Sequence, residues 1–238
     1  MEGIIRNLIF STFFLFSNIQ SQSYSISIFG YEIANLLIES KGPEEINFSV
    51  NSIGLADFIW PTNNNYNTVI DSSTFYLKEY HYKINQMNSK SEFILKSSTS
   101  KNLIYNKKET LSLDTPFHTF FTLIALLKKS SPRDLDIKWY PYESFGILGR
   151  ARFIWADSSN LFNTGDSIMC DHYRLDIEFL EKDIFELNES DHLINSLISD
   201  SSVRELWISK EKEPRILLFK LKKDFLTFDV KILQKNMK

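Results

Sequence analysis

The chain has 238 residues and a formal net charge of −3 at pH 7. Hydrophobic residues make up 43% and charged residues 24%, with only 7 glycines and 6 prolines, a composition that excludes a low-complexity chain. No basic excess is present to neutralise a phosphate backbone, so we expect no nucleic-acid binding. The 20 phenylalanines and 10 tyrosines favour half-buried pleated surfaces and therefore indicate strands.

The N-terminal residues have the layout of a secretory signal peptide. Arg6 precedes an apolar stretch, Leu8 to Phe16, and small polar residues follow it. We interpret residues 1–23 as a signal peptide and residues 24–238 as a single β-rich domain, located in the periplasm or secreted. An uncleaved anchor or a buried first strand are the alternatives. A membrane helix needs ~20 apolar residues, and no later segment reaches that length, so we expect no transmembrane span in the mature chain.

Strand-like segments follow one another along most of the remaining chain. Residues 46–50 alternate between apolar and polar side chains, and the same period of two returns over 174–179 and 226–232. The Asn-rich segment 61–67 (PTNNNYN) is interpreted as a turn, because proline fixes φ and asparagine tolerates left-handed backbone. Turn signals recur at spacings that predict an antiparallel sheet or barrel.

One segment in the middle of the chain follows a helical period instead. Asp114 or Thr115 is expected as the N-cap, and Pro116 suits the first helical position. The spacing predicts an amphipathic helix over about 116–129, and a weaker helical pattern runs over 193–198. The apolar stripe of the first helix consists of Phe117, Phe120, Phe121, Ile124 and Leu127.

A charged segment near the C-terminus is predicted to be a hairpin turn. Residues 203–208 and 215–221 are expected to be paired strands, and residues 209–214 their connection, with Pro214 where no ladder N–H is needed. Trp207 is expected to face the core.

Motifs that carry catalysis are missing: the sequence has no P-loop, no G-x-G-x-x-G, no H-E-x-x-H and no G-x-S-x-G. Cys170 and His172 share one face of a predicted strand, and a nucleophile–base pair there is the one basis for a hydrolase; a buried, inert cysteine is the favoured interpretation. Asp114 and His118 are interpreted as a helix cap beside a first-turn histidine, and Asp191-His192 as part of an exposed loop. We therefore expect no catalytic residue, no metal site and no cofactor.

The order of these features resembles a family of exported bacterial β-rich domains of unknown function. The matching residues are Asp114-Thr115-Pro116 with the Phe-rich segment after it, Leu206-Trp207-Ile208-Ser209, Pro214-Arg215-Ile216, and the segment from Asn163 to Leu175, and the resemblance covers about 28–233. It implies a strongly curved antiparallel sheet or half-open barrel, with the helix against its concave side. That shape is similar to the periplasmic lipoprotein carriers. The family brings no catalytic residues to carry over.

These features together predict a non-enzymatic envelope protein. Its aromatic helix either fills a core or lines a cavity for a lipid or acyl chain, and a purely structural envelope subunit is a further alternative. The partners to be expected are an apolar ligand or an envelope protein. The expected ligand-binding residues are Phe117, Phe120, Phe121, Ile124 and Trp207.

Overall fold

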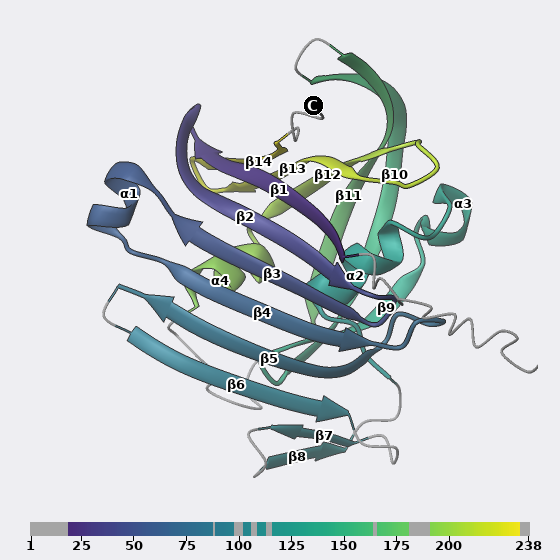
Figure 1. Ribbon diagram of the computed structural model, residues 1–238. Helices are drawn as coiled ribbons and strands as arrows, with labels where there is room; N and C mark the ends of the chain where they lie inside the picture. The colour runs from purple at the N-terminus through teal and green to yellow at the C-terminus, as the bar shows by residue number, and fades with distance from the viewer. Residues whose placement is uncertain are drawn as a thin grey trace, which may run out of the picture.

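A computed structural model describes residues 19–87, 89–97, 102–105, 109–112, 116–163, 166–180 and 191–233. Within these residues, fourteen antiparallel strands form one sheet in the order β8-β7-β6-β5-β4-β3-β2-β1-β14-β13-β12-β11-β10-β9. Figure 1 shows that the sheet is strongly curved and wraps around a central helix, α2. The outermost strands, β8 and β9, are not paired with each other, so the described sheet is an open, β-barrel-like structure. The predicted fold class is therefore confirmed.

The strands fall into two groups along the chain. The first group comprises β1 (Ile19–Ile28), β2 (Tyr31–Lys41), β3 (Glu45–Ser52), β4 (Asn63–Ile70), β5 (Leu77–Gln86), β6 (Ser89–Ser97), β7 (Asn102–Tyr105) and β8 (Glu109–Ser112). The second group comprises β9 (Trp139–Ser144), β10 (Ile147–Asn163), β11 (Asp166–Phe179), β12 (Val203–Ser209), β13 (Ile216–Lys223) and β14 (Leu226–Ile232). Within each group every strand pairs with its neighbour in sequence, and β1 pairs with β14 to join the groups.

Four short helices accompany the described sheet: α1 (Gly54–Ile59), α2 (Phe120–Leu127), α3 (Pro132–Leu135) and α4 (His192–Ile198). α2 connects the two groups of strands and lies on the concave side, where all its residues except Leu126 are buried (Figure 1). Its first turn is closed by a capping box: the side chain of Thr119 accepts from Thr122 N, while the side chain of Thr122 accepts from Thr119 N.

The observed helix α2 is therefore shorter at both ends than the helix predicted over 116–129. Phe117 and His118 are extended instead, because their backbones continue the sheet hydrogen bonding. Leu77 N donates to Phe117 O, and Glu143 N donates to His118 O. The expected cap residues Asp114 and Thr115 lie outside the described residues.

The Asn-rich segment was predicted to be a turn, and this prediction is wrong, because residues 63–70 form strand β4. Three of its asparagines, Asn64, Asn65 and Asn67, donate hydrogen bonds to neighbouring side chains. Asn64 is buried, where its Nδ2 donates to Tyr66 Oη, and Asn67 Nδ2 donates to Glu45 Oε1 on the next strand. The second predicted helix corresponds to α4, and the predicted C-terminal hairpin to β12 and β13.

The described chain begins inside the segment that was expected to be a signal peptide. Strand β1 starts at Ile19, so the expected boundary at residue 23 falls within a paired strand, and Ser23 O accepts from Leu233 N. Residues 1–18 lie outside the described part. Among the described helices, none has the length and apolar character to cross a membrane.

Candidate ligand cavity

A cavity of about 710 Å³ lies between the concave face of the sheet and helices α1, α2 and α4. Its size is within the range of ~300–1,000 Å³ that is usual for ligand sites. Inward-facing residues of eight strands line it, because side chains alternate between the two faces of a strand: these strands are β1 to β5 and β12 to β14. The pattern over Phe48 and Val50 illustrates this, since both are buried and line the cavity while Ser49 points to the other face.

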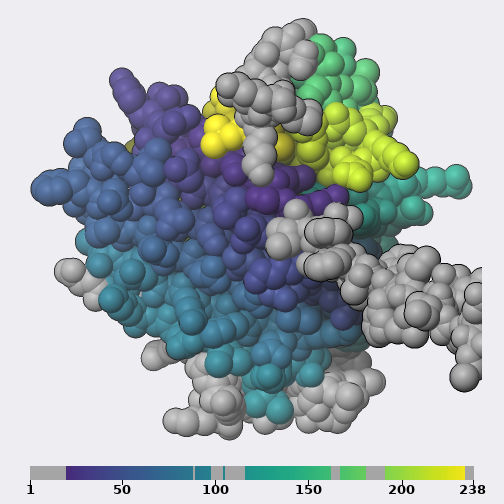
Figure 2. All heavy atoms as spheres, viewed as in Figure 1, coloured from purple at the N-terminus to yellow at the C-terminus, as the bar shows by residue number. Residues whose placement is uncertain are grey.

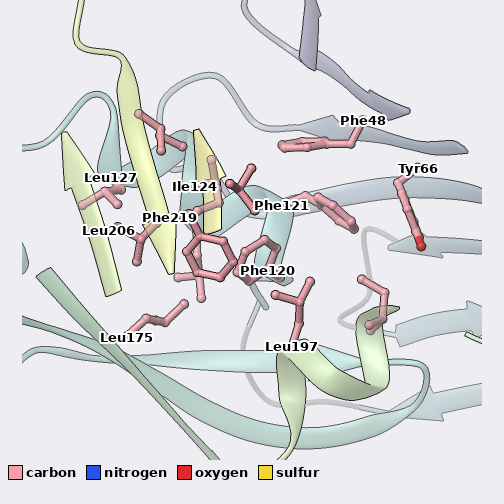
Figure 3. Close-up of a cluster of buried hydrophobic side chains, with 14 of the residues drawn as sticks. Phe48, Tyr66, Phe120, Phe121, Ile124, Leu127, Leu175, Leu197, Leu206 and Phe219 are labelled. Atoms are coloured by element: carbon pink, nitrogen blue, oxygen red, sulfur yellow. The ribbon is translucent and has the colours of Figure 1, made fainter. Parts of the chain in front are cut away.

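Aromatic side chains from α2 form the inner wall of the cavity. Phe121 lies against Phe48 and Tyr66, with ring centroids 4.5 and 4.9 Å apart, and Phe120 lies 5.8 Å from Phe219 (Figure 3). Ile124 lines the same wall one turn later. These contacts hold the helix against strands from both groups, and the cavity lies beside it.

The cavity opens where α1 crosses the ends of the strands. Leu55, Ile59 and Trp60 line the cavity and are also exposed to solvent, by 80%, 69% and 40%. None of the residues of α1 is buried. The ring of Trp60 meets the ring of His192 edge-on at 5.0 Å, so the start of α4 borders the same mouth.

Exposed apolar side chains surround this mouth. Phe58 on α1 is 87% exposed, and Phe225 in the β13–β14 turn is 81% exposed. Phe29 in the β1–β2 turn and Tyr31 at the start of β2 are exposed as well. Ile28 pairs with Phe228, so the β1–β2 and β13–β14 turns lie at the same end of the sheet. Figure 2 shows α1 (blue) and the end of the β1–β2 hairpin (purple) projecting on the same side of the molecule.

A buried carboxylate, that of Asp191, lies behind two lining residues, Tyr66 and Gln86. Asp191 is fully buried, caps α4 by accepting from Ile194 N at 3.1 Å, and accepts from Tyr66 Oη at 3.0 Å. Gln86 Nε2 reaches the same carboxylate at 3.5 Å, and Gln86 Oε1 accepts from His192 N. Burial raises the pKa of Asp191 to about 6, because the charged form loses its hydration; its hydrogen bonds oppose that shift.

Asp191 and its partners were not found by sequence reasoning, which placed Asp191-His192 in an exposed loop. The only local signal was an aspartate directly before a weak helical pattern, which is an N-cap signature. Tyr66 and Gln86 lie more than 100 residues away in sequence, so no local pattern points to them.

Three of the five residues that were expected to bind a ligand line the cavity, namely Phe120, Phe121 and Ile124. Phe117 is buried in the core but is not part of the lining, because the chain is extended at that position. Trp207 does not line the cavity either. Its neighbour Leu206 does, so the alternation of β12 turns Trp207 to the outer face.

The prediction that Trp207 faces the core is therefore corrected. Trp207 is half-buried on the convex face, where its ring stacks on His172 at 4.1 Å with an angle of 8°. Lys220 Nζ lies 5.6 Å from the same ring, and His172 Nε2 lies 3.3 Å from Glu205 Oε1. The outer surface of β11–β13 is thus a layer of stacked and paired side chains.

Cys170 and His172 do not form the arrangement of a nucleophile and its base. Cys170 is fully buried, its thiol donates to Ile168 O at 3.4 Å, and burial raises its pKa. His172 instead faces Trp207 and Glu205. Across the described ranges, no cluster of three or more His, Cys, Asp or Glu side chains could hold a metal ion.

His118, the other histidine considered for chemistry, is buried beneath α2. Its Nδ1 lies 3.2 Å from Thr122 Oγ1, and its ring lies 4.6 Å from that of Tyr76. Burial lowers the pKa of His118 to about 4, so the imidazole is neutral at pH 7. His118 therefore lies in the packed interior and is not part of the cavity lining.

Comparison with solved structures shows a similarity in fold alone. The similar structure is a β-barrel-like protein of a domain of unknown function, DUF1849, from Brucella abortus, with a TM-score of 0.59 and 8% sequence identity. The superposition covers 91% of this chain and 96% of the other. No family model matches this sequence, and no curated protein does. The similarity therefore shows a fold shared with a bacterial protein of unknown function.

Proposed function

We propose that this chain is a non-enzymatic protein of the cell envelope that binds an apolar ligand, a lipid or acyl chain, inside its curved sheet. The observation that carries the proposal is the cavity of about 710 Å³ lined by Phe120, Phe121 and the inward residues of eight strands. A packed protein interior leaves few voids larger than a water molecule, so an apolar space of this size is typical of a binding site.

The envelope location rests on the N-terminal sequence, where a basic residue precedes an apolar stretch and small polar residues follow. The open sheet with a helix on its concave side supports the binding function, because it gives an apolar ligand access from one end.

Two neighbouring residues on β2 allow a matched test. Ala34 is buried and lines the cavity, whereas Asn35 is exposed on the opposite face. Ala34→Phe would place an aromatic ring inside the cavity and is expected to abolish binding of a fluorescent apolar probe. Asn35→Phe adds the same ring outside and should leave binding unchanged.

Native mass spectrometry after gentle extraction would then identify the ligand. Absence of any copurifying lipid, together with no probe binding by the unmodified chain, would contradict the proposal.

Contact of the mouth with another envelope component is a second candidate function, supported by the exposed aromatics around it. Phe29 is 68% exposed and has a left-handed backbone, with φ of 52°, at the tip of the β1–β2 turn. A bulky residue there costs about 1–3 kcal/mol, and Asn-Gly is preferred in such turns. The exposed ring of Phe29 is kept despite this backbone strain, which favours a role for Phe29 in contact with another envelope component.

A photo-crosslinking residue at position 29 would test this second candidate in cells that produce the protein. We expect crosslinked products at Phe29 and none at Asn35 on the convex face. Phe29→Asn should keep or raise the stability of the hairpin while removing the contact. Equal crosslinking at both positions would indicate nonspecific collisions.

A further inference from the structure

The lining of the cavity is free of charged side chains. None of the residues that line it is Asp, Glu, Lys or Arg. Moving an unpaired charge into such surroundings is strongly unfavourable, because no group inside replaces its hydration. The enclosed part of a ligand must therefore be uncharged.

Four polar lining side chains lie at the mouth, among the exposed apolar residues of α1. Ser52 ends β3, Thr62 precedes β4, Gln86 ends β5 and His192 begins α4. They are linked to one another: Thr62 N donates to Ser52 Oγ at 2.7 Å, Thr62 forms a bridge with Gln86, and Gln86 Oε1 accepts from His192 N at 3.1 Å. The Ser52 hydroxyl and the Gln86 amide are engaged within the protein, so the exposed imidazole of His192 and the solvent at the opening are what this end offers to the polar part of a ligand.

Toward the opposite end the lining is mostly apolar, and the hydroxyls of its two tyrosines, Tyr24 and Tyr66, are engaged by other side chains of the protein. Ile38 pairs with Phe48 at that level, whereas Ala34 pairs with Ser52 at the mouth. The four steps along β3 from Ser52 to Phe48 correspond to about 13 Å. The apolar end is closed by the aromatic wall of α2, so polarity changes along the length of the cavity.

From this gradient we infer that the ligand is a chain-like amphiphile held in one orientation. Its hydrocarbon tail lies against Phe120 and Phe121 of α2, and its polar end lies at the mouth beside Gln86 and His192. This inference rests on the proposed binding function and adds the class and the direction of the ligand.

The tryptophans of the chain provide a direct test. Trp60 lines the mouth, whereas Trp139, Trp155 and Trp207 are not part of the lining. A nitroxide spin label quenches tryptophan fluorescence only at short range. Stearic acid labelled near its carboxyl end should therefore quench Trp60, and stearic acid labelled near its methyl end should quench it less. Trp60→Phe should remove this difference, and the substitution is mild because Trp60 is partly exposed.

A second reporter covers the apolar end. Phe121→Trp, introduced into the Trp60→Phe chain, should show the reverse order, with the methyl-end label quenching more strongly. If this variant does not fold, the comparison at Trp60 still decides the orientation.

Electron paramagnetic resonance of the same labels measures binding independently, because a bound label is immobilised. Immobilised labels with equal or reversed quenching of Trp60 would overturn the orientation and leave the binding function standing. Labels that remain freely tumbling at all protein concentrations would overturn both.

Discussion

The phenol of Tyr66 donates to the buried carboxylate of Asp191, with oxygen–oxygen distances of 3.0 and 3.1 Å across 125 residues of sequence. This contact joins β4 to the start of α4 beside the cavity. Burial raises the pKa of the Asp191 carboxyl to about 6, above the value of ~3.9 expected in the unfolded chain.

Asp191→Asn should therefore change how stability depends on pH. A raised pKa stabilises the fold fully below about pH 4, and this contribution is lost as the pH rises through about 6. Asparagine caps a helix about as well and carries no charge. We expect the variant to gain up to about 3 kcal/mol relative to the unmodified chain between pH 4 and pH 7. Urea denaturation across this range measures the difference, and a constant difference would contradict the prediction.

Asp191→Ala is the control for the cap itself. It removes the acceptor for Ile194 N and leaves Tyr66 Oη with Asn64 as its remaining partner. Loss of an N-cap costs about 0.5–2 kcal/mol, so this variant should fall below Asp191→Asn at every pH.

His118→Gln should change the pH dependence of stability in the opposite sense to Asp191→Asn. Burial lowers the pKa of His118 to about 4, from ~6.5 in the unfolded chain. The contribution of His118 to the stability of the fold is therefore present above pH 6.5 and is lost as the pH falls toward 4. The variant loses the ring contact with Tyr76 and should be less stable at pH 7. It should, however, lose less stability on acidification, as thermal unfolding at pH 7 and pH 4.5 would show.

Trp207 and Leu206 should differ in their cost of truncation. Leu206 is fully buried on the concave face, and Leu206→Ala is expected to cost about 2–5 kcal/mol. Trp207→Ala loses mainly the stack on His172 and should cost about 1–3 kcal/mol. Chemical denaturation of both variants provides the ranking. A larger loss for Trp207 would mean that the outer stacked layer carries more of the stability than the concave face.

Cys170 should be inert toward thiol reagents while the chain is folded. The residue is fully buried and burial raises the pKa of its thiol, so little reactive thiolate is available. We expect no reaction with an aromatic disulfide reagent under native conditions and stoichiometric reaction in denaturant. Rapid native labelling would reopen the hypothesis of a reactive site near His172.

The sequence was informative where the pattern is local. Alternation predicted the antiparallel sheet, and turn chemistry predicted the hairpin of β12 and β13. The Phe-rich helix was predicted at the right place but began too early, because its true cap, Thr119, follows an extended segment that pairs with the sheet. Local propensity gives no information on the pairing of this extended segment with the sheet.

The parts that could not be predicted depend on distant contacts. The inward or outward direction of Trp207 is set by the register of β12, which a one-residue shift would reverse. The burial of Asp191 requires Tyr66 and Gln86 from another part of the sheet. An aromatic stripe fits a packed core and a cavity equally well, so only the arrangement of the opposing strands distinguishes the two.

The pairing of β1 with β14 makes the chain a natural candidate for circular permutation. All other strand pairs in the described sheet join neighbours in sequence, whereas Ser27 contacts Asp229 across 202 residues. Closing that pair late, after two local meanders have formed, would make it the slow step of folding. A permuted chain that links position 233 to position 19 and begins after β8 would turn this distant pair into a local one. It should therefore refold faster than the natural order of strands.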